Sequence, residues 1–228
     1  MLRGRPRGRE RKKNDMDINE AEEPGVFPEL SEKVLGLMRR VREALFTPDA
    51  ALAKRLGGEC NALAAETRKA EADCNAGVLV GIATEEERLG CVRRAQQYSR
   101  LGRIVHQLSV LVQNLQEIAK DVLPEELEAF RSIYLLAEVE LSDAVLSVLR
   151  GDESLAHGVV RKDAELDEMY AKEMERIFRA ASGAMFYEFR TGIGLLFILR
   201  AIERIGDHAK QLAVPSFYLL NNNETKQS

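Results

Sequence analysis

Residues 155–177 read LAHGVVRKDAELDEMYAKEMERI, and the spacing of apolar residues in this stretch decides the fold class. Apolar side chains recur every three or four residues, which places them on one side of an α-helix with about 3.6 residues per turn. Charged residues fill the opposite side, as in a helix that packs one face against a core. The stretch therefore predicts a long amphipathic helix.

The same spacing runs from Leu30 onward and is interrupted where Pro, Gly or Asp residues punctuate the chain. Helix starts are marked by capping residues and by proline in the first turn, as in Thr84-Glu85-Glu86-Glu87 and Pro124-Glu125-Glu126. The pattern predicts six helices, at about 30–46, 48–82, 84–121, 124–150, 152–181 and 183–219.

The predicted helix lengths run short, long, long and then moderate, long, long, which indicates an internal repeat. Leu52-Ala53 near the start of one long helix corresponds to Leu155-Ala156 near the start of another. The sequence therefore predicts an all-α fold, a tandem repeat of two antiparallel three-helix bundles. The first bundle is expected at residues 30–122 and the second at 123–220, with a short tail at 221–228.

The composition agrees with a helical protein. The 228 residues contain no Trp, 6% are aromatic and 31% are charged, which does not favour aromatic-rich β-strands. The longest apolar run, Gly192–Leu199, is far shorter than the roughly 20 residues of a membrane-spanning helix, so a soluble protein is expected. Cys60, Cys74 and Cys91 show no metal-ligand spacing, and an odd cysteine count without a secretory signal fits a reducing cytoplasm.

The first 29 residues differ from the rest of the chain. Basic residues interleaved with Gly and Pro are followed by acidic residues, with almost nothing apolar between them. Such a segment buries too little surface to offset its ordering entropy, so a disordered charged tail is expected at residues 1–29. A basic arm for nucleic acid or anionic lipid is the alternative, and nucleic-acid binding is not expected elsewhere. Translation from Met16 would remove the basic run entirely.

Two helices carry carboxylates where an amphipathic helix should be apolar. Asp163 and Asp167 lie about 40° apart, within the apolar stripe of the helix at 152–181. Glu203 and Asp207 share the same four-residue spacing at the margin of the apolar face of the last helix. Ionised carboxylates on a packing face need a cation, strong hydrogen bonds or a raised pKa.

Four carboxylates from two adjacent antiparallel helices form an oxygen-rich site suited to Mg²⁺, Mn²⁺, Ca²⁺ or iron. Asp163, Asp167, Glu203 and Asp207 are therefore the candidate metal ligands. The alternative is that basic side chains such as Arg200, Arg204 or Lys210 pair with these acids. His208 is expected to be solvated or at a boundary rather than a ligand.

Sequence motifs of enzymes are missing. The chain has no phosphate-binding GxxxxGK[ST] loop, no GxGxxG, no GxSxG elbow and no HExxH. The di-iron class requires ExxH pairs, and the residues three before His106, His157 and His208 are Arg, Ser and Ile. No catalytic residue or organic cofactor site is expected.

The segment LRAIERIGDHAKQLA at residues 199–213 closely resembles the ERIGDHA signature of the PhoU phosphate-uptake regulators. The preceding VRKDAELDEMY at residues 160–170 is similar to the DxxxD helix of that family. Motif, order, spacing and helix lengths agree in the second half. The resemblance extends over about residues 30–220, although the first half matches in pattern more than in residues.

The resemblance implies a cytoplasmic homodimer that is not an enzyme and that negatively regulates phosphate uptake and phosphate-responsive signalling. Such proteins act as adaptors between the ATPase subunit of a phosphate ABC transporter and a sensor histidine kinase. Their acidic motifs can bind metal clusters, which by motif match assigns that role to Asp163, Asp167, Glu203 and Asp207.

The first repeat departs from the family pattern. Cys60 and Ala64 stand where Asp163 and Asp167 would be matched, and Gly102 and His106 stand in place of the second carboxylate pair. One metal site per chain is therefore expected. Two other functions stay open, a carboxylate-bundle metal-binding protein or enzyme, and an accessory protein of an ion-driven phosphate permease.

Overall fold

The computed structural model describes residues 25–47, 50–79, 84–181 and 186–224. Nearly all of the expected N-terminal tail, including its basic run and Met16, lies outside the described residues. The same holds for the last four residues of the expected C-terminal tail.

The described chain is helical and contains no strand, which confirms the all-α prediction. Its helices are α1 (Val26–Phe46), α2 (Ala50–Leu79), α3 (Glu85–Ile118), α4 (Pro124–Glu128), α5 (Arg131–Arg150), α6 (Glu153–Ala181) and α7 (Phe186–Glu224). None of the helices in these described ranges combines the length and the apolar character needed to cross a membrane.

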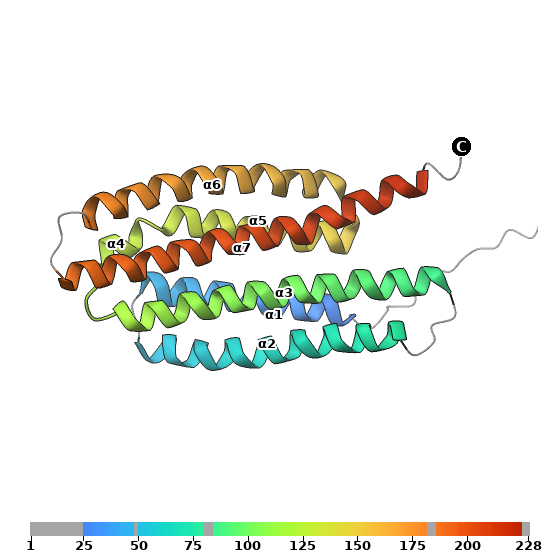
Figure 1. The fold of residues 1–228 in the computed structure, drawn as a ribbon, viewed down its shortest axis with the longest axis horizontal. Helices are drawn as coiled ribbons and strands as arrows, with labels where there is room; N and C mark the ends of the chain where they lie inside the picture. Colours follow the sequence, from blue (N-terminus) through green and yellow to red (C-terminus); the bar gives the residue numbers. More distant parts are fainter. Residues whose placement is uncertain (1–24, 48–49, 80–83, 182–185, 225–228) are drawn as a thin grey trace, which may run out of the picture.

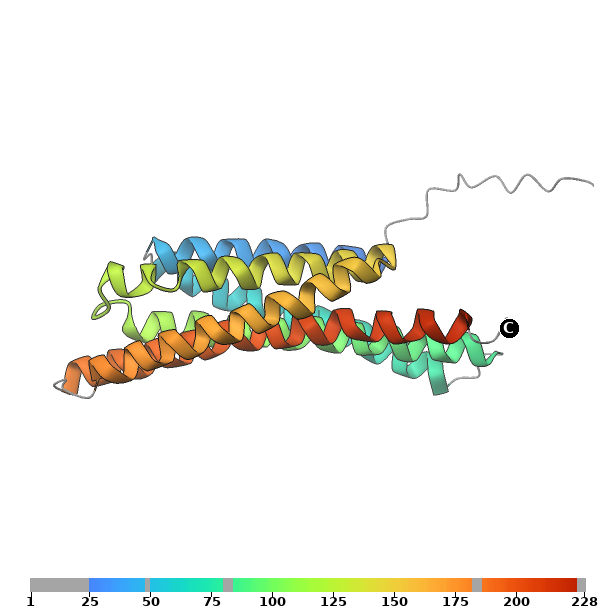
Figure 2. The ribbon, with the colours of Figure 1, turned by 90° about the horizontal axis from the view of Figure 1, so that it is seen from above.

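Two three-helix units lie side by side along the long axis of the molecule (Figure 1). One unit consists of α1, α2 and α3, and the other of α5, α6 and α7. The short α4 connects the two units along the chain. The units meet along two seams, α3 against α7 and α1 against α5 (Figure 2). A single cluster of buried apolar side chains runs through both units, so the two bundles share one core.

The helix-start signals act as the sequence predicts. The Thr84 hydroxyl accepts a hydrogen bond from the Glu87 backbone N–H at 3.2 Å, and the Glu87 carboxylate accepts one from the Thr84 N–H at 3.1 Å. This capping box satisfies two amide donors at the start of α3. Gly151, at a φ of 62°, ends α5 in the left-handed region that glycine tolerates. The Asp152 carboxylate then accepts the Leu155 N–H at 3.1 Å and caps α6.

Three boundaries differ from the prediction, and one of them is the end of the last helix, which runs to Glu224 and into the tail expected at 221–228. The first helix begins at Val26 rather than near Leu30, and it places Phe27 in the core. The helix expected at 124–150 is divided into α4 and α5 around Phe130. Leu127 and Phe130 are both buried at this break.

Candidate carboxylate site

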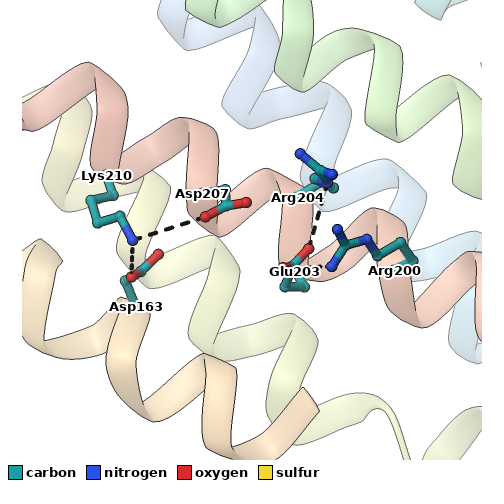
Figure 3. Close-up of polar contacts among 6 residues, drawn as sticks. All are labelled: Asp163, Arg200, Glu203, Arg204, Asp207 and Lys210. Atoms are coloured by element: carbon teal, nitrogen blue, oxygen red, sulfur yellow. Dashed lines mark hydrogen bonds and ion pairs between the residues drawn. The ribbon is translucent and has the colours of Figure 1, made fainter. Parts of the chain in front are cut away.

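Helices α6 and α7 run antiparallel and bring their acidic residues to one seam (Figure 3). Asp163 extends from α6 toward Asp207 and Lys210 of α7, and Glu203 lies about one turn away along α7. The expected juxtaposition of the two acidic motifs is therefore present for Asp163, Glu203 and Asp207.

Lys210 lies between carboxylates of the two helices. Its ammonium donates to Oδ2 of Asp163, which is only 4% exposed, and lies 3.9 Å from Oδ1 of the half-buried Asp207. One cation thus links α6 to α7 at the point where two of the candidate ligands approach each other.

Glu203 has basic partners of its own. The Arg200 guanidinium donates from Nη1 to Glu203 Oε1 at 2.7 Å, and Nε of Arg204 lies 3.9 Å from Oε2. Arg200 also lies over the ring of Tyr170 on α6, 5.7 Å from its centroid. Asp163, Glu203 and Asp207 therefore pair with basic side chains. These are the partners Arg200, Arg204 and Lys210 that the sequence offered as the alternative to a metal.

Asp167 does not lie in the buried stripe, contrary to the expectation from helical spacing. Its side chain is exposed, whereas Asp163, Leu166 and Val159 are buried. The buried arc of α6 is centred near Val159 and Leu166, and Asp167 falls about 80° from Val159, beyond its edge. Asp167 therefore borders the site from solvent.

A fifth carboxylate, which the sequence reasoning missed, lies behind the site. Glu140 of α5 is 0% exposed, and neither of its carboxylate oxygens has a hydrogen-bond partner. The signal was available, because Glu140 follows Ile133 by seven residues and Ala137 by three, on the buried face of α5. Glu140 thus lies on the buried face of α5, as Asp163 lies on the buried face of α6.

Burial and like charges disfavour the ionised form of these acids. Burial raises the pKa of Glu140 to about 8, and the neighbouring negative charge of Asp163 adds to the effect. Burial also raises the pKa of Asp163, against the opposing hydrogen bond from Lys210. The pKa of Glu203 is raised by burial and lowered by Arg200. Burial thus favours the protonated, neutral forms of Glu140, Asp163 and Glu203.

His208 is buried at 6% exposure, which corrects the expectation of a solvated or boundary side chain. Its Nδ1 has no hydrogen-bond partner. Burial lowers the pKa of His208, and the charges of Arg103 and Arg100 lower it further. The imidazole is thus a neutral part of the packing between α7 and α3.

The acids of this seam that have polar contacts in the structure pair with basic side chains. In the described part of the chain no three acidic, thiol or imidazole side chains stand close enough together to hold a metal as they are placed. The oxygens of Glu140 nevertheless lack a partner, and the donor set consists of carboxylates, which hard cations prefer. A metal ion would have to replace basic side chains that contact these acids.

Comparisons with known proteins point to one family. Residues 130–214 match the family model of the PhoU domain. The chain is 31% identical, over 114 residues, to a phosphate-specific transport system accessory protein PhoU homolog of Xylella fastidiosa, a match that covers 48% of this chain and 46% of that protein. It is 24% identical over 148 residues to PhoU homolog 1 of Methanothermobacter thermautotrophicus, covering 61% of this chain and 65% of the relative. The chain thus spans about half to two thirds of the length of these curated relatives.

Solved structures share the fold over most of the chain. The crystal structure of PhoU from Pseudomonas aeruginosa superposes with a TM-score of 0.75 at 20% identity, covering 86% of this chain and 94% of that one. The phosphate transport system regulatory protein PhoU from Streptococcus pneumoniae superposes with a TM-score of 0.76 at 19% identity, covering 86% and 92%. The matched domain at residues 130–214, with its ERIGDHA motif, shows that the chain contains a PhoU domain, and most of the chain shares the fold of PhoU proteins.

Proposed function

We propose that this protein is a cytoplasmic negative regulator of phosphate uptake and of phosphate-responsive two-component signalling. It acts without catalysis, as an adaptor between the ATPase subunit of a phosphate ABC transporter and a sensor histidine kinase. The observation that carries the proposal is the PhoU domain at residues 130–214. The fold shared with two PhoU crystal structures supports it over most of the chain.

A deletion strain carrying a reporter of a phosphate-starvation promoter tests the regulatory role. In phosphate-rich medium the deletion should derepress the reporter, and a plasmid copy of the gene should restore repression. Unchanged reporter expression in the deletion strain would contradict the proposal.

Recovery of partners tests the adaptor role separately. Tagged protein, cross-linked in phosphate-replete cells and purified, should carry the kinase and the transporter ATPase subunit, identified by mass spectrometry. Recovery of an ion-driven permease in their place would favour the permease-accessory alternative. The adaptor is further proposed to work as a homodimer, which light scattering on the purified protein will measure.

The candidate carboxylate site is proposed to bind one divalent metal ion or iron cluster per chain through Asp163, Asp167, Glu203 and Asp207. Two observations support this role, the burial of Asp163 and Glu203 and the all-oxygen character of the ligands. When bound, a metal would supply positive charge that cross-links α6 and α7.

Metal binding should raise the melting temperature in proportion to occupancy, because a ligand of the folded state stabilises it by mass action. Asp167→Ala should abolish the rise produced by added Mn²⁺ or Mg²⁺. Ala64→Ser, at the matching position of the first repeat, should leave the rise intact. Protein purified without chelator that contains no metal by mass spectrometry, and shows no thermal response to either ion, would end the metal proposal.

A further inference from the structure

All three cysteines of the chain lie in the first bundle, and two of them contact the same arginine. The Arg94 guanidinium donates from Nη2 to Cys91 Sγ at 3.2 Å. It also hydrogen-bonds to the thiol of Cys74. Cys91 and Arg94 belong to α3, whereas Cys74 belongs to the neighbouring α2. One positive charge is therefore shared by two thiols from two packed helices.

No carboxylate competes for this guanidinium on its own helix. Between Glu87 and Glu117 the sequence of α3 contains no Asp or Glu. Among the described residues Arg94 forms no ion pair, and its hydrogen-bond partners are the two thiols. The guanidinium lies along α3, with Nη1 3.5 Å from where a Cβ of Gly90 would stand. A cation beside a thiol stabilises the thiolate, which is the nucleophilic form of cysteine.

The register of α2 and α3 sets the separation of the two thiols. The helices run antiparallel (Figure 1), and a Cβ at Gly102 of α3 would stand 3.1 Å from Oγ1 of Thr67 on α2. Seven residues from this contact along each helix are Cys74 and Ala95, and Cys91 lies one turn beyond Ala95. The two cysteines are therefore offset by about 6 Å along the helix axes.

A disulfide requires Cα atoms within about 7 Å of each other, so one helix end has to shift to join the two sulfurs. Both cysteines stand where such a shift is least costly. Cys74 precedes the last residue of α2, Leu79, by five residues, and Cys91 follows the first residue of α3, Glu85, by six. Helix ends open locally at a lower free energy than the core of a bundle.

The cysteines differ in access to solvent. Cys74 is partly buried, Cys91 is 8% exposed and Cys60 is 0% exposed. Burial raises the pKa of the Cys60 thiol to about 11, and the nearby charge of Glu59 raises it further. A small oxidant therefore reaches Cys74 first, and Cys60 serves as an unreactive reference within the same chain.

We propose that Cys74 and Cys91 form a thiol pair that hydrogen peroxide oxidises to a disulfide linking α2 to α3. This inference goes beyond the proposed function and depends on neither phosphate nor a metal ion. Arg94 is a positioning residue, which holds both sulfur atoms and stabilises the attacking thiolate.

The oxidation has two steps. The Cys74 thiolate attacks one oxygen of hydrogen peroxide, so that an S–O bond forms while the O–O bond breaks, and the departing hydroxide takes up the thiol proton and leaves as water. The Cys91 sulfur then attacks the sulfenic sulfur of Cys74. The S–S bond forms, and the hydroxyl group leaves as water with the Cys91 proton. The two thiols lose two electrons, and one peroxide is reduced to two molecules of water.

Substitutions separate the two steps. Cys91→Ser keeps the first step, so Cys74 sulfenic acid should accumulate without a disulfide. Cys74→Ser should slow the oxidation of Cys91 to the rate of Cys60. Arg94→Gln should slow the oxidation of Cys74 about fivefold or more, and Arg94→Lys should keep most of the rate, because the positive charge is retained. Arg93→Gln is the matched control, because Arg93 is an exposed arginine of the same helix with no thiol contact among the described residues.

The reaction is followed on full-length, reduced protein at fixed pH in a small excess of hydrogen peroxide. Dimedone traps sulfenic acid, N-ethylmaleimide blocks the remaining thiols, and peptide mass spectrometry quantifies each cysteine. In wild type, Cys74 and Cys91 should be oxidised about tenfold faster than Cys60, and their two peptides should be recovered joined. Circular dichroism and melting temperatures before oxidation check that each variant folds.

Three results would overturn the proposal. The first is equal oxidation rates for all three cysteines. The second is a fast oxidation of Cys74 that ends at sulfenic acid in wild type, or that joins two chains into a dimer on a non-reducing gel. The third is an unchanged rate in Arg94→Gln, which would remove the basis for selective oxidation of Cys74. The phosphate-starvation reporter tests the regulatory role independently of these results.

Discussion

In the described structure Lys210 donates a hydrogen bond to the carboxylate of Asp163, a residue that is only 4% exposed. The pairing of Asp163 depends on this side chain. Removing one partner of a buried charge pair leaves the other desolvated without compensation. Lys210→Met should therefore lower the free energy of unfolding by about 1–3 kcal/mol, the range for hydrogen bonds to charged groups.

Urea unfolding at pH 7 in the presence of chelator measures this change. Lys33→Met is the control, because Lys33 pairs with Glu29 and Glu66 on an exposed surface and its loss should have little effect. Equal destabilisation by the two substitutions would show that the Asp163 pair has no special weight.

Glu140 should make the stability of the metal-free protein depend on pH. Burial raises the pKa of Glu140 from 4.5, the ordinary value for an exposed Glu, to about 8 in the folded chain. Between these values the folded state keeps a proton that the unfolded chain has released. The stability from this group is therefore complete below pH 4.5 and is lost as pH rises through 8.

Glu140→Gln cannot ionise, so it removes this pH dependence while keeping the charges that face the group, Asp163, Asp167, Asp207 and Lys210. Both proteins are measured in chelator. The melting temperature of Glu140→Gln minus that of wild type should rise steadily from pH 5 to pH 8.5. A constant difference across that range would show that Glu140 ionises normally.

At the residue level, helical spacing predicted the burial of Asp163 and the marginal position of Asp207. It failed for Asp167. Asp163 and Asp167 lie about 40° apart, and this spacing does not tell which of the two lies nearer the edge of the buried arc. Glu140 was missed because the sequence reasoning looked for paired acids, and Glu140 has no partner four residues away. Contacts with Lys210 depend on how two helices pack, which spacing within one helix does not contain.

At the scale of elements, the seam between α3 and α7 depends on a glycine. A Cβ at Gly194 of α7 would overlap the side chain of Ile118 on α3. Gly194→Ala should therefore force the two helices apart and destabilise the protein by about 1–3 kcal/mol, the usual cost of overpacking.

Gly58→Ala on α2 is the control for helix propensity, because nothing lies within 4 Å of a Cβ at that position. It should stabilise the protein by up to about 1 kcal/mol, as expected for alanine replacing glycine inside a helix. Thermal unfolding of both variants compares the two effects. Stabilisation by Gly194→Ala would contradict the close approach of α3 and α7.

Most helices were predictable because Pro, Gly, Thr and Asp residues mark their ends. The break between α4 and α5 was not, since Ala129 and Phe130 carry no sequence signal for a helix end. Leu127 and Phe130 are both buried at that break, a packing feature that local sequence signals do not report. Likewise, the α1 start at Val26 follows from the packing of Phe27, 6.2 Å from the ring of Tyr98 on α3.

At the scale of the whole molecule, the two bundles are parts of one core. The Tyr134 hydroxyl of α5 donates to the Met38 carbonyl of α1 at 2.7 Å, so the second seam is tied by a buried hydrogen bond as well as by apolar contact. A chain limited to residues 123–228 would expose both seams to water.

The isolated second half should therefore lose cooperative unfolding, although it contains the whole PhoU-domain match. Circular dichroism during urea titration should show a broad, shallow transition for residues 123–228 and a sharp one for the full chain. A sharp transition at the same urea concentration for both would mean that the halves are stable independently.

Helix α7 contacts both α6, at the carboxylate seam, and α3 of the first bundle. A small rotation of a rigid helix about one point displaces its distant residues in proportion to their separation from that point. Gly194 and Asp207 are 13 residues apart on it, which corresponds to about 20 Å along the axis. A tilt of α7 by about 5° at Asp207 would move the backbone at Gly194 by nearly 2 Å over that length. A displacement of this size at Ile118 exceeds what close-packed side chains absorb in place, so a tilt of α7 that begins at its acidic motif would have to repack the first bundle.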